Sequence, residues 1–280
     1  MTPDDVAILR CPESGRPLTF DGALDRRGHL ARGRLRPQGG GEGWAVLAGL
    51  PRLYREAWIQ GPDRFMRRWF YDAVPRAHDP AVRLLLPLFQ GPRETEDHLR
   101  EQYLTRMALD DLPTDRPVRI LEVSVGTGAN LPRLRARLPK GVQAQIWGLD
   151  LSAGMVGRLQ ASGRAGDARL LLGDAHRLPF ATASFDRVLH VGGINAFADA
   201  GRALAEMARV ARPGTPIVVC DEQLDPGRPH GLGHRLAFKA VTFYDRNPHS
   251  PVDRLPPGAQ VLADEQPSRF FYSLTWQMPG

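Results

Sequence analysis

The most regular pattern of apolar and polar positions in this 280-residue chain starts at residue 118. An almost unbroken apolar run, rich in β-branched residues, covers residues 118–125 and predicts a strand buried on both faces of a parallel sheet. The run ends at Gly126-Thr127-Gly128, after which Leu131, Leu134 and Leu138 recur at helical spacing. Because glycines allow a tight turn and the close approach of a ligand, the stretch predicts the opening of a nucleotide-binding βαβ unit.

The alternation of strand-like and helix-like segments continues to residue 221 and predicts an α/β fold with a parallel sheet. A polar insert, rich in proline and histidine, follows at about residues 223–257, and an alternating segment at 270–276 predicts a closing strand. Beyond the first unit, strands are expected at 145–150, 170–174, 184–191 and 216–221, and helices at 152–160 and 200–211.

Two segments precede this α/β domain, which we place at residues 113–280. Residues 1–55 consist of short β segments, and a short strand that enters the turn Cys11-Pro12-Glu13-Ser14-Gly15 is expected at their start. Residues 56–112 carry amphipathic helical patterns punctuated by prolines. This helical segment either covers a ligand site as a lid, with Tyr71 or Tyr103 touching the ligand, or packs against the main sheet.

The charge balance bears on possible partners. The formal net charge is +6 and the sequence pI is about 9.9, which by themselves suggest nucleic acid. Lysine occurs only at Lys140 and Lys239, however, and the arginines are spread along the whole chain among Asp and Glu. This even distribution favours a compositional bias over a phosphate-binding surface, so nucleic acid is not the expected partner.

Cysteine usage and hydropathy bear on the compartment. The two cysteines, Cys11 and Cys220, lie far apart in the sequence, which provides no disulfide framework and fits a reducing compartment. No apolar stretch reaches the length of a transmembrane helix, and the first residues do not resemble a signal peptide. We therefore expect a cytoplasmic protein without membrane contact.

Acidic residues stand at three successive strand ends, namely Glu122, Asp150 and Asp174. A carboxylate beside the glycine turn would repel a diphosphate, so Glu122 favours a cationic ligand such as a sulfonium amino acid over NAD or ATP. Asp150 lies about twenty residues past the turn, where a carboxylate accepts hydrogen bonds from both ribose hydroxyls. The alternative role for Asp150 is to cap the next helix, but Ser152 already suits that position. Asp174 is suited to accept a hydrogen bond from the exocyclic amine of a base.

Residues 117–221 resemble the class I S-adenosylmethionine-dependent methyltransferases, in the subgroup similar to the ubiquinone and menaquinone methyltransferases (methyltransferase domain 11/25). The resemblance implies a Rossmann-like, mostly parallel seven-stranded sheet that ends in an antiparallel hairpin, with S-adenosylmethionine as cofactor and S-adenosylhomocysteine as product. The segments that carry it are Leu121-Glu122-Val123-Ser124-Val125-Gly126-Thr127-Gly128, Gly148-Leu149-Asp150-Leu151-Ser152-Ala153-Gly154-Met155, Gly173-Asp174-Ala175, Leu178-Pro179-Phe180, Ser184-Phe185-Asp186, Arg212-Pro213-Gly214 and Val219-Cys220-Asp221-Glu222.

The same resemblance implies a role for each matching residue. Glu122 lies near the methionine ammonium, Asp150 holds the ribose, and Asp174 with Ala175 holds the adenine. Ser124 stands where the family usually has glycine. Its short side chain is expected to be tolerated there; the alternative is that it crowds the aminoacyl tail and weakens binding. The remaining residues expected at the cofactor are Val125, Gly126, Thr127, Gly128, Leu151, Met155 and His190.

The N-terminal segment resembles the small β-ribbon of the Trm112 family, in which a Cys-Pro-x-Cys turn begins the ribbon and a Gly-Ile-Pro-type hairpin ends it. Here Ser14 replaces the second cysteine of that turn, and no second cysteine pair follows. A structural zinc site needs four Cys or His ligands, so no metal is expected.

The residues that contact the methyl acceptor are less clearly indicated by the sequence than those at the cofactor. A general base is needed only when the acceptor must lose a proton, and His190, near the end of the fourth strand, is the candidate. The alternative is a histidine hydrogen-bonded within the sheet. Asn195 is suited to position a polar acceptor, and the insert contributes His234 and Tyr244. The spacing of the histidines in the insert matches no zinc pattern.

These observations predict a methyltransferase that acts on the oxygen, nitrogen or carbon of a small molecule in secondary or cofactor metabolism, as a monomer or homodimer. One alternative is an RNA methyltransferase, since some carry an N-terminal zinc ribbon. The missing ribbon ligands and the absence of an Asn-Pro-Pro-Tyr or Asp-Pro-Pro-Tyr motif argue against it. The other alternative is a cofactor-binding scaffold that activates a partner, against which the complete set of carboxylates argues.

Overall fold

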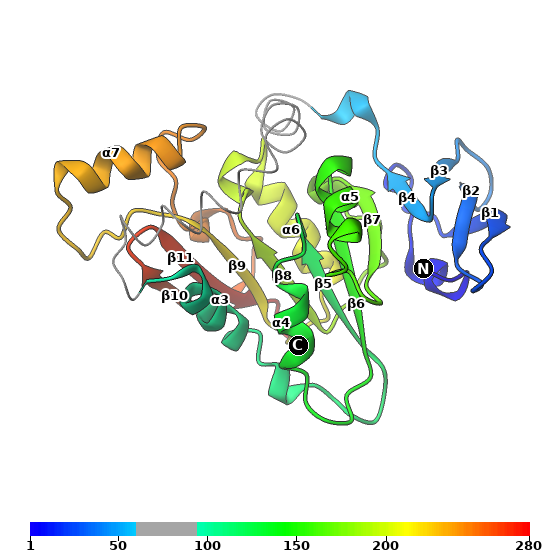
Figure 1. The fold of residues 1–280 in the computed structure, drawn as a ribbon, viewed down its shortest axis with the longest axis horizontal. Coiled ribbons are helices and arrows are strands. Elements are labelled where there is room, and N and C mark those ends of the chain that lie inside the picture. The colour runs from blue at the N-terminus through cyan, green and yellow to red at the C-terminus, as the bar shows by residue number, and fades with distance from the viewer. Residues whose placement is uncertain (60–93) are drawn as a thin grey trace.

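The computed structural model describes residues 1–59 and 94–280. Its centre is a sheet whose five middle strands run parallel, in the order β7-β6-β5-β8-β9, followed by the antiparallel strands β11 and β10 (Figure 1). These seven strands have the arrangement that the resemblance implies. Their bounds are β5 Val118–Val123, β6 Ala144–Asp150, β7 Arg169–Gly173, β8 Arg187–Val191, β9 Ile217–Glu222, β10 Gln260–Ser268 and β11 Phe271–Gln277.

The N-terminal ribbon continues the same sheet, which therefore has eleven strands in the described part of the chain. Its last strand, β4, pairs in parallel with β7, with Leu53 opposite Gly173. The ribbon and the β10–β11 hairpin consequently lie at opposite ends of the sheet (Figure 1). The ribbon strands are β1 Leu18–Leu24, β2 Leu30–Pro37, β3 Trp44–Leu47 and β4 Leu50–Leu53.

The first residues differ from the prediction. A short strand was expected before the Cys11 turn, but Asp4–Ile8 forms a 3-10 helix. Pro3 precedes this helix with helical dihedral angles, and the Asp5 carboxylate accepts a hydrogen bond from the Thr2 N–H at 2.7 Å, which closes the first turn. Leu9 then bridges to Phe180 in the main domain.

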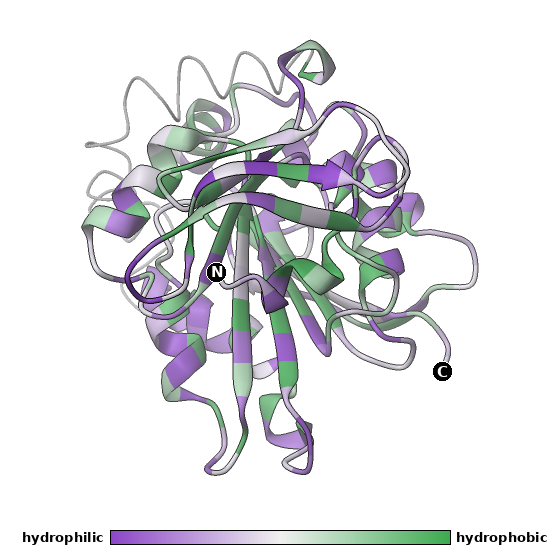
Figure 2. Cartoon of the chain, turned by 90° about the vertical axis from the view of Figure 1, so that its right-hand side faces the viewer, coloured by the Kyte–Doolittle hydropathy of each residue, from purple (hydrophilic) through white to green (hydrophobic). Residues whose placement is uncertain are grey.

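Helices cover both faces of the sheet. The hydrophobic core on one face includes buried residues of α3, α4 and α5, and the core on the other face includes those of α6 together with apolar residues of the ribbon. Figure 2 shows the apolar positions concentrated along the central strands. The α-helices of the described residues are α3 Glu96–Thr105, α4 Leu131–Ala136, α5 Ala153–Ala161, α6 Ala200–Val210 and α7 Leu232–Val241. Besides Asp4–Ile8, short 3-10 helices of this part of the chain lie at Glu56–Trp58, Leu109–Asp111, Ala175–Arg177, Ile194–Ala196 and Val252–Arg254.

The insert contains α7, which the sequence did not predict. Phe238 is its one buried residue, whereas Leu232 and Leu236 are exposed, so its apolar positions form no core-facing stripe. Within the described ranges, every helix is too short or too polar to span a lipid bilayer.

Candidate functional site

The three acidic residues predicted at strand ends meet at one edge of the sheet. Glu122 lies near the end of β5, Asp150 ends β6, and Asp174 directly follows β7. Parallel pairing in register sets Glu122 opposite Gly148 and Asp150 opposite Leu172, so the carboxyl ends of the three strands lie together. All three side chains are buried, with exposed fractions of 2%, 8% and 7%.

Glu122 is the most deeply enclosed of the three. Its Oε1 accepts a hydrogen bond from Asn130 Nδ2 at 2.6 Å, whereas its Oε2 is buried with no hydrogen-bond partner among the described residues. Burial raises the pKa of Glu122 to about 7, against the opposing effects of the Asn130 hydrogen bond and the Arg100 charge. A buried carboxylate oxygen without a donor is costly, which indicates that a ligand donor belongs beside it.

Helix α3 binds the amide oxygen of Asn130, whose nitrogen donates to Glu122. Tyr103 OH and Arg100 Nη1 both donate to Asn130 Oδ1, each at 2.6 Å, and Arg100 also pairs with Glu96 on the same helix. Sequence reasoning missed Asn130 and Arg100, and it considered Tyr103 only as a lid residue. The available signal was an amide two residues past the glycine turn, directly before the helix that follows the turn.

Asp150 ties the glycine turn to β6. Its Oδ2 accepts the Gly126 N–H and its Oδ1 accepts the Ser152 N–H, both at 2.8 Å. Ser152 caps α5, because its hydroxyl accepts the Met155 N–H at 3.2 Å, as the sequence predicted. A carboxylate has about four acceptor sites, so two backbone hydrogen bonds by themselves do not saturate one.

Asp174 begins the short helix Ala175–Arg177. Its Oδ1 accepts the His176 N–H at 2.9 Å and lies 2.7 Å from His176 Nδ1. Burial acts to raise the pKa of Asp174, but the two His176 hydrogen bonds together with the His176 and Arg177 charges outweigh it and lower that pKa below its usual value. Asp174 therefore stays ionised at neutral pH, and His176 was not predicted at the site.

The glycine turn has left-handed backbone at Ser124, Gly126 and Gly128, with φ of 59°, 55° and 71°. A Cβ on Gly128 would lie 2.2 Å from Leu159 Cδ1, so this glycine is required for α5 to pack against the turn. Among the described residues, a Cβ on Gly126 would meet Met155 Cε at 3.8 Å and Ser124 O at 3.9 Å, which are ordinary van der Waals contacts.

Of the residues predicted to contact the methyl acceptor, His190 lies near the end of β8. His190 on β8 is 0% exposed. Its Nδ1 lies 3.1 Å from Val123 O, whereas its Nε2 is buried without a partner in the described part of the chain. Burial lowers the pKa of His190. Because a carbonyl accepts only from a donor, the proton resides on Nδ1 and Nε2 is left as an acceptor.

Asn195 and Tyr244 meet at Glu222, which ends β9. Asn195 Nδ2 donates to the Glu222 backbone carbonyl at 2.8 Å, and Tyr244 OH donates to Glu222 Oε2 at 2.6 Å. His234 lies on α7, half-buried, with its ring 6.3 Å from that of His230. Tyr71 lies outside the described residues.

Comparison with known proteins places this geometry in a family. A family profile described as "Methyltransferase domain" matches residues 121–219. The O-methyltransferase rstn1 of Aspergillus nomiae is 30% identical over 180 residues, which cover 55% of this chain and 78% of that protein. The chain belongs to the class I S-adenosylmethionine-dependent methyltransferases.

The methyltransferase also resembles a Thermus thermophilus demethylmenaquinone methyltransferase, with 36% identity over 49% of this chain and 61% of that enzyme. It spans between 46% and 61% of the length of three such enzymes. The solved structure of Haemonchus contortus phosphoethanolamine N-methyltransferase 2 with S-adenosyl-L-methionine shares the fold, with a TM-score of 0.57 and 15% identity over 85% of this chain and 64% of that one. S-adenosylmethionine is the cofactor of this family.

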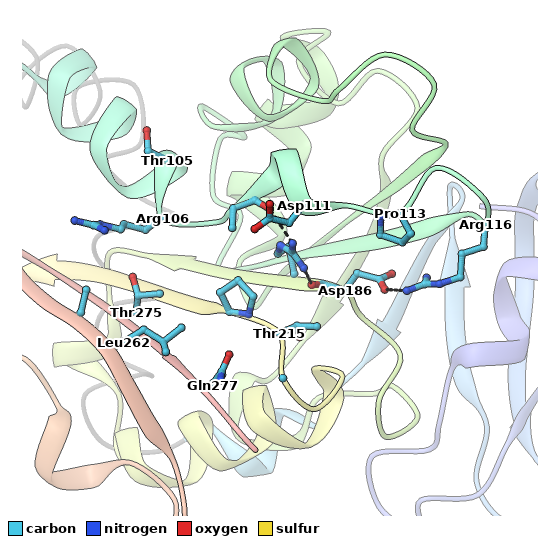
Figure 3. A pocket seen from close by; sticks show the side chains of 15 residues that line it. Thr105, Arg106, Asp111, Pro113, Arg116, Asp186, Thr215, Leu262, Thr275 and Gln277 are labelled. Carbon is cyan, nitrogen blue, oxygen red and sulfur yellow. Dashed lines mark hydrogen bonds and ion pairs between the residues drawn. The ribbon is translucent and has the colours of Figure 1, made fainter. Parts of the chain in front are cut away.

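A separate cavity of about 550 Å³ opens at the edge where the parallel strands begin (Figure 3). It is lined by Arg106 after α3, by Asp186 before β8 and by Pro216 before β9, so it lies across the sheet from the carboxylates. Asp186 pairs with Arg116 at 2.6 Å and accepts the Arg119 N–H at 2.8 Å. These contacts join β5 to β8, and the cavity contains none of the predicted site residues of the methyltransferase.

We expect the Ser124→Gly variant to be more stable than the wild-type methyltransferase by about 1 kcal/mol, because a left-handed L-residue is strained and glycine is not. Urea unfolding measures the change. Ser162→Gly is the control, since Ser162 has a φ of −76° and its hydroxyl donates to Leu159 O. The control should lose stability, and a loss in Ser124→Gly as well would show that the Ser124 side chain is stabilising.

Proposed function

We propose that this protein transfers a methyl group from S-adenosylmethionine to a small-molecule acceptor. The observation that carries the proposal is the set of three buried carboxylates, Glu122, Asp150 and Asp174, at adjacent strand ends. One of them, Glu122, has a buried oxygen without a hydrogen-bond partner among the described residues. The cofactor has complementary groups in the same order, because its ammonium, its ribose hydroxyls and its adenine amine are all hydrogen-bond donors.

The fit can be stated group by group. Glu122 Oε2 would accept from the ammonium, and Asp150 would accept from the ribose hydroxyls. Asp174 would accept from the adenine amine, and the Ala175 N–H would donate to a ring nitrogen. The described residues leave room for a Cβ at Gly126, and the aminoacyl tail would pass on that side of the turn. The remaining proposed contacts are Ser124, Val125, Thr127, Gly128, Leu151, Met155 and His190.

When bound, S-adenosylmethionine supplies a methyl group that is already activated by a positively charged sulfur. The protein's contribution is to hold the acceptor in line with that methyl, which supplies much of the rate through proximity and orientation. His190 would take a proton at Nε2 if the acceptor must lose one, since its Nδ1 proton is committed to Val123 O. Asn195, Tyr244 and His234 are the proposed acceptor contacts.

The acceptor class is proposed from the chemistry of the relatives. The similar proteins are named demethylmenaquinone methyltransferase, which states a quinone acceptor, and O-methyltransferase, which states an oxygen acceptor. Within the described residues, no group of three His, Cys, Asp or Glu side chains is placed to hold a metal ion. In the proposed reaction, side chains of the described residues position the acceptor and, where a proton must be removed, the buried His190 accepts it.

The test is transfer of a labelled methyl group from S-adenosylmethionine, with quinols, phenols and amines in one series and bulk RNA in another. We expect label in at least one small molecule and none in RNA. Label in RNA alone would replace the proposal with the RNA methyltransferase alternative. Tight S-adenosylhomocysteine binding, without transfer to any acceptor, would favour the scaffold alternative.

A further inference from the structure

We propose that Asn130 is a positioning residue that links helix α3 to the cofactor by orienting the Glu122 carboxylate and favouring its charged form. The inference rests on the proposed function, in which Glu122 receives the cofactor ammonium. It concerns three residues that the family comparison leaves without a role: Asn130 itself, and Arg100 and Tyr103, which hold it from α3.

The hydrogen bonds fix the orientation of the Asn130 amide. Arg100 can only donate a hydrogen bond, so the oxygen of the amide must face α3 and its NH₂ group must face Glu122. Tyr103 supplies the second donor to the same oxygen, and burial raises the pKa of Tyr103 well above its usual value, so its hydroxyl keeps its proton. The amide therefore presents a donor to Glu122 only while α3 is docked in this position.

These contacts offset part of the free-energy cost of burying the ionised Glu122 carboxylate. An amide whose oxygen is bound by a guanidinium is polarised, and its N–H becomes a stronger donor. The Arg100 charge acts in the same direction, whereas Asp150 opposes it. Among the described residues, the charged or titratable groups around Glu122 and Asn130 are Arg100, Tyr103 and Glu96 from α3, Asp150 from β6 and Cys220 from β9.

The consequence is a cofactor affinity that depends on pH. Glu122 has a pKa of about 7, so about half of the ligand-free protein has this group protonated at neutral pH. An ammonium binds the ionised form, so affinity is constant above the pKa and falls about tenfold for each pH unit below it. Weakening the Asn130 bond moves this midpoint to higher pH. The resulting loss of affinity is small above the new midpoint, grows through neutral pH and is largest below the wild-type midpoint.

The test compares wild type with Asn130→Leu and Tyr103→Phe between about pH 5.5 and about pH 8. One readout is the ¹³C resonance of the Glu122 carboxyl in ligand-free protein, assigned by its loss in Glu122→Gln. The other is the dissociation constant of S-adenosylhomocysteine. Tyr54→Phe is the matched control, because the Tyr54 hydroxyl contacts Glu56 on the ribbon side.

We expect Asn130→Leu to raise the Glu122 midpoint by about one pH unit and to weaken binding about fivefold at neutral pH and about tenfold at about pH 5.5. Tyr103→Phe, which retains the buried ring, should shift both in the same direction by less, and Tyr54→Phe should shift neither. An unchanged midpoint of the Glu122 carboxyl in both Asn130→Leu and Tyr103→Phe would overturn the inference. If wild type shows no S-adenosylhomocysteine binding at any pH, the proposed function fails, whereas the carboxyl titration still tests the effect of Asn130 on Glu122.

Discussion

Replacing Asp150 with alanine is expected to weaken S-adenosylhomocysteine binding about hundredfold or more. Two effects combine in this loss. The ribose loses a charged acceptor, and each hydrogen bond to a charged group is worth about 1.5–3 kcal/mol. The turn also loses its anchor, because the same carboxylate accepts the N–H groups of Gly126 and Ser152. Isothermal titration measures the affinity, and thermal unfolding measures the accompanying loss of stability.

Asp186→Ala is the matched control for this prediction. Like Asp150, Asp186 is buried and accepts a backbone N–H. It also pairs with Arg116, and it lies beside the cavity at the opposite edge of the sheet (Figure 3). Its removal should destabilise the protein and leave the affinity of the remaining folded fraction unchanged. If Asp150→Ala binds as tightly as wild type, Asp150 has no place at the ribose and the proposed cofactor site is wrong.

Much of the main sheet was predictable, because the strands buried on both faces have apolar runs and end at acidic or glycine residues. The order of strand and helix then implied parallel pairing, and parallel strands bring Glu122, Asp150 and Asp174 to one edge. Periodicity failed at β10. This edge strand is exposed along most of its length, so its polar sequence does not alternate.

The contacts around Glu122 could not be predicted from local pattern. Arg100 and Tyr103 lie about thirty residues before Asn130, and nothing in their spacing indicates that α3 docks on the helix after the glycine turn. The pairing of β4 with β7 has the same character, because two short apolar segments more than a hundred residues apart carry no sign of their adjacency. In both cases the tertiary packing of the core determines the partners.

The Glu122→Gln variant is expected to be more stable than wild type in the absence of ligand and yet to bind S-adenosylhomocysteine about hundredfold more weakly at about pH 8. Binding is lost because a neutral amide cannot pair with an ammonium. Stability is gained because wild type must bury an ionised carboxylate whose Oε2 has no partner in the described residues. Glu265→Gln, which removes an exposed ion pair with Arg106, is the control and should change neither property appreciably.

The pH dependence of that gain identifies its cause. The pKa of Glu122 is raised from 4.5 to about 7 in the folded protein, so the unfolded chain releases this proton first. Wild-type stability therefore falls as pH rises from about 4.5 to about 7 and then stays constant, at a total cost of about 3 kcal/mol. Glutamine does not titrate, although its NH₂ group inherits the unpaired position and offsets part of the gain. Urea unfolding at about pH 8 should thus show a net gain of about 1–2 kcal/mol, which disappears at about pH 4.5. A gain of equal size at both pH values would mean that burial of the Glu122 charge is not its source.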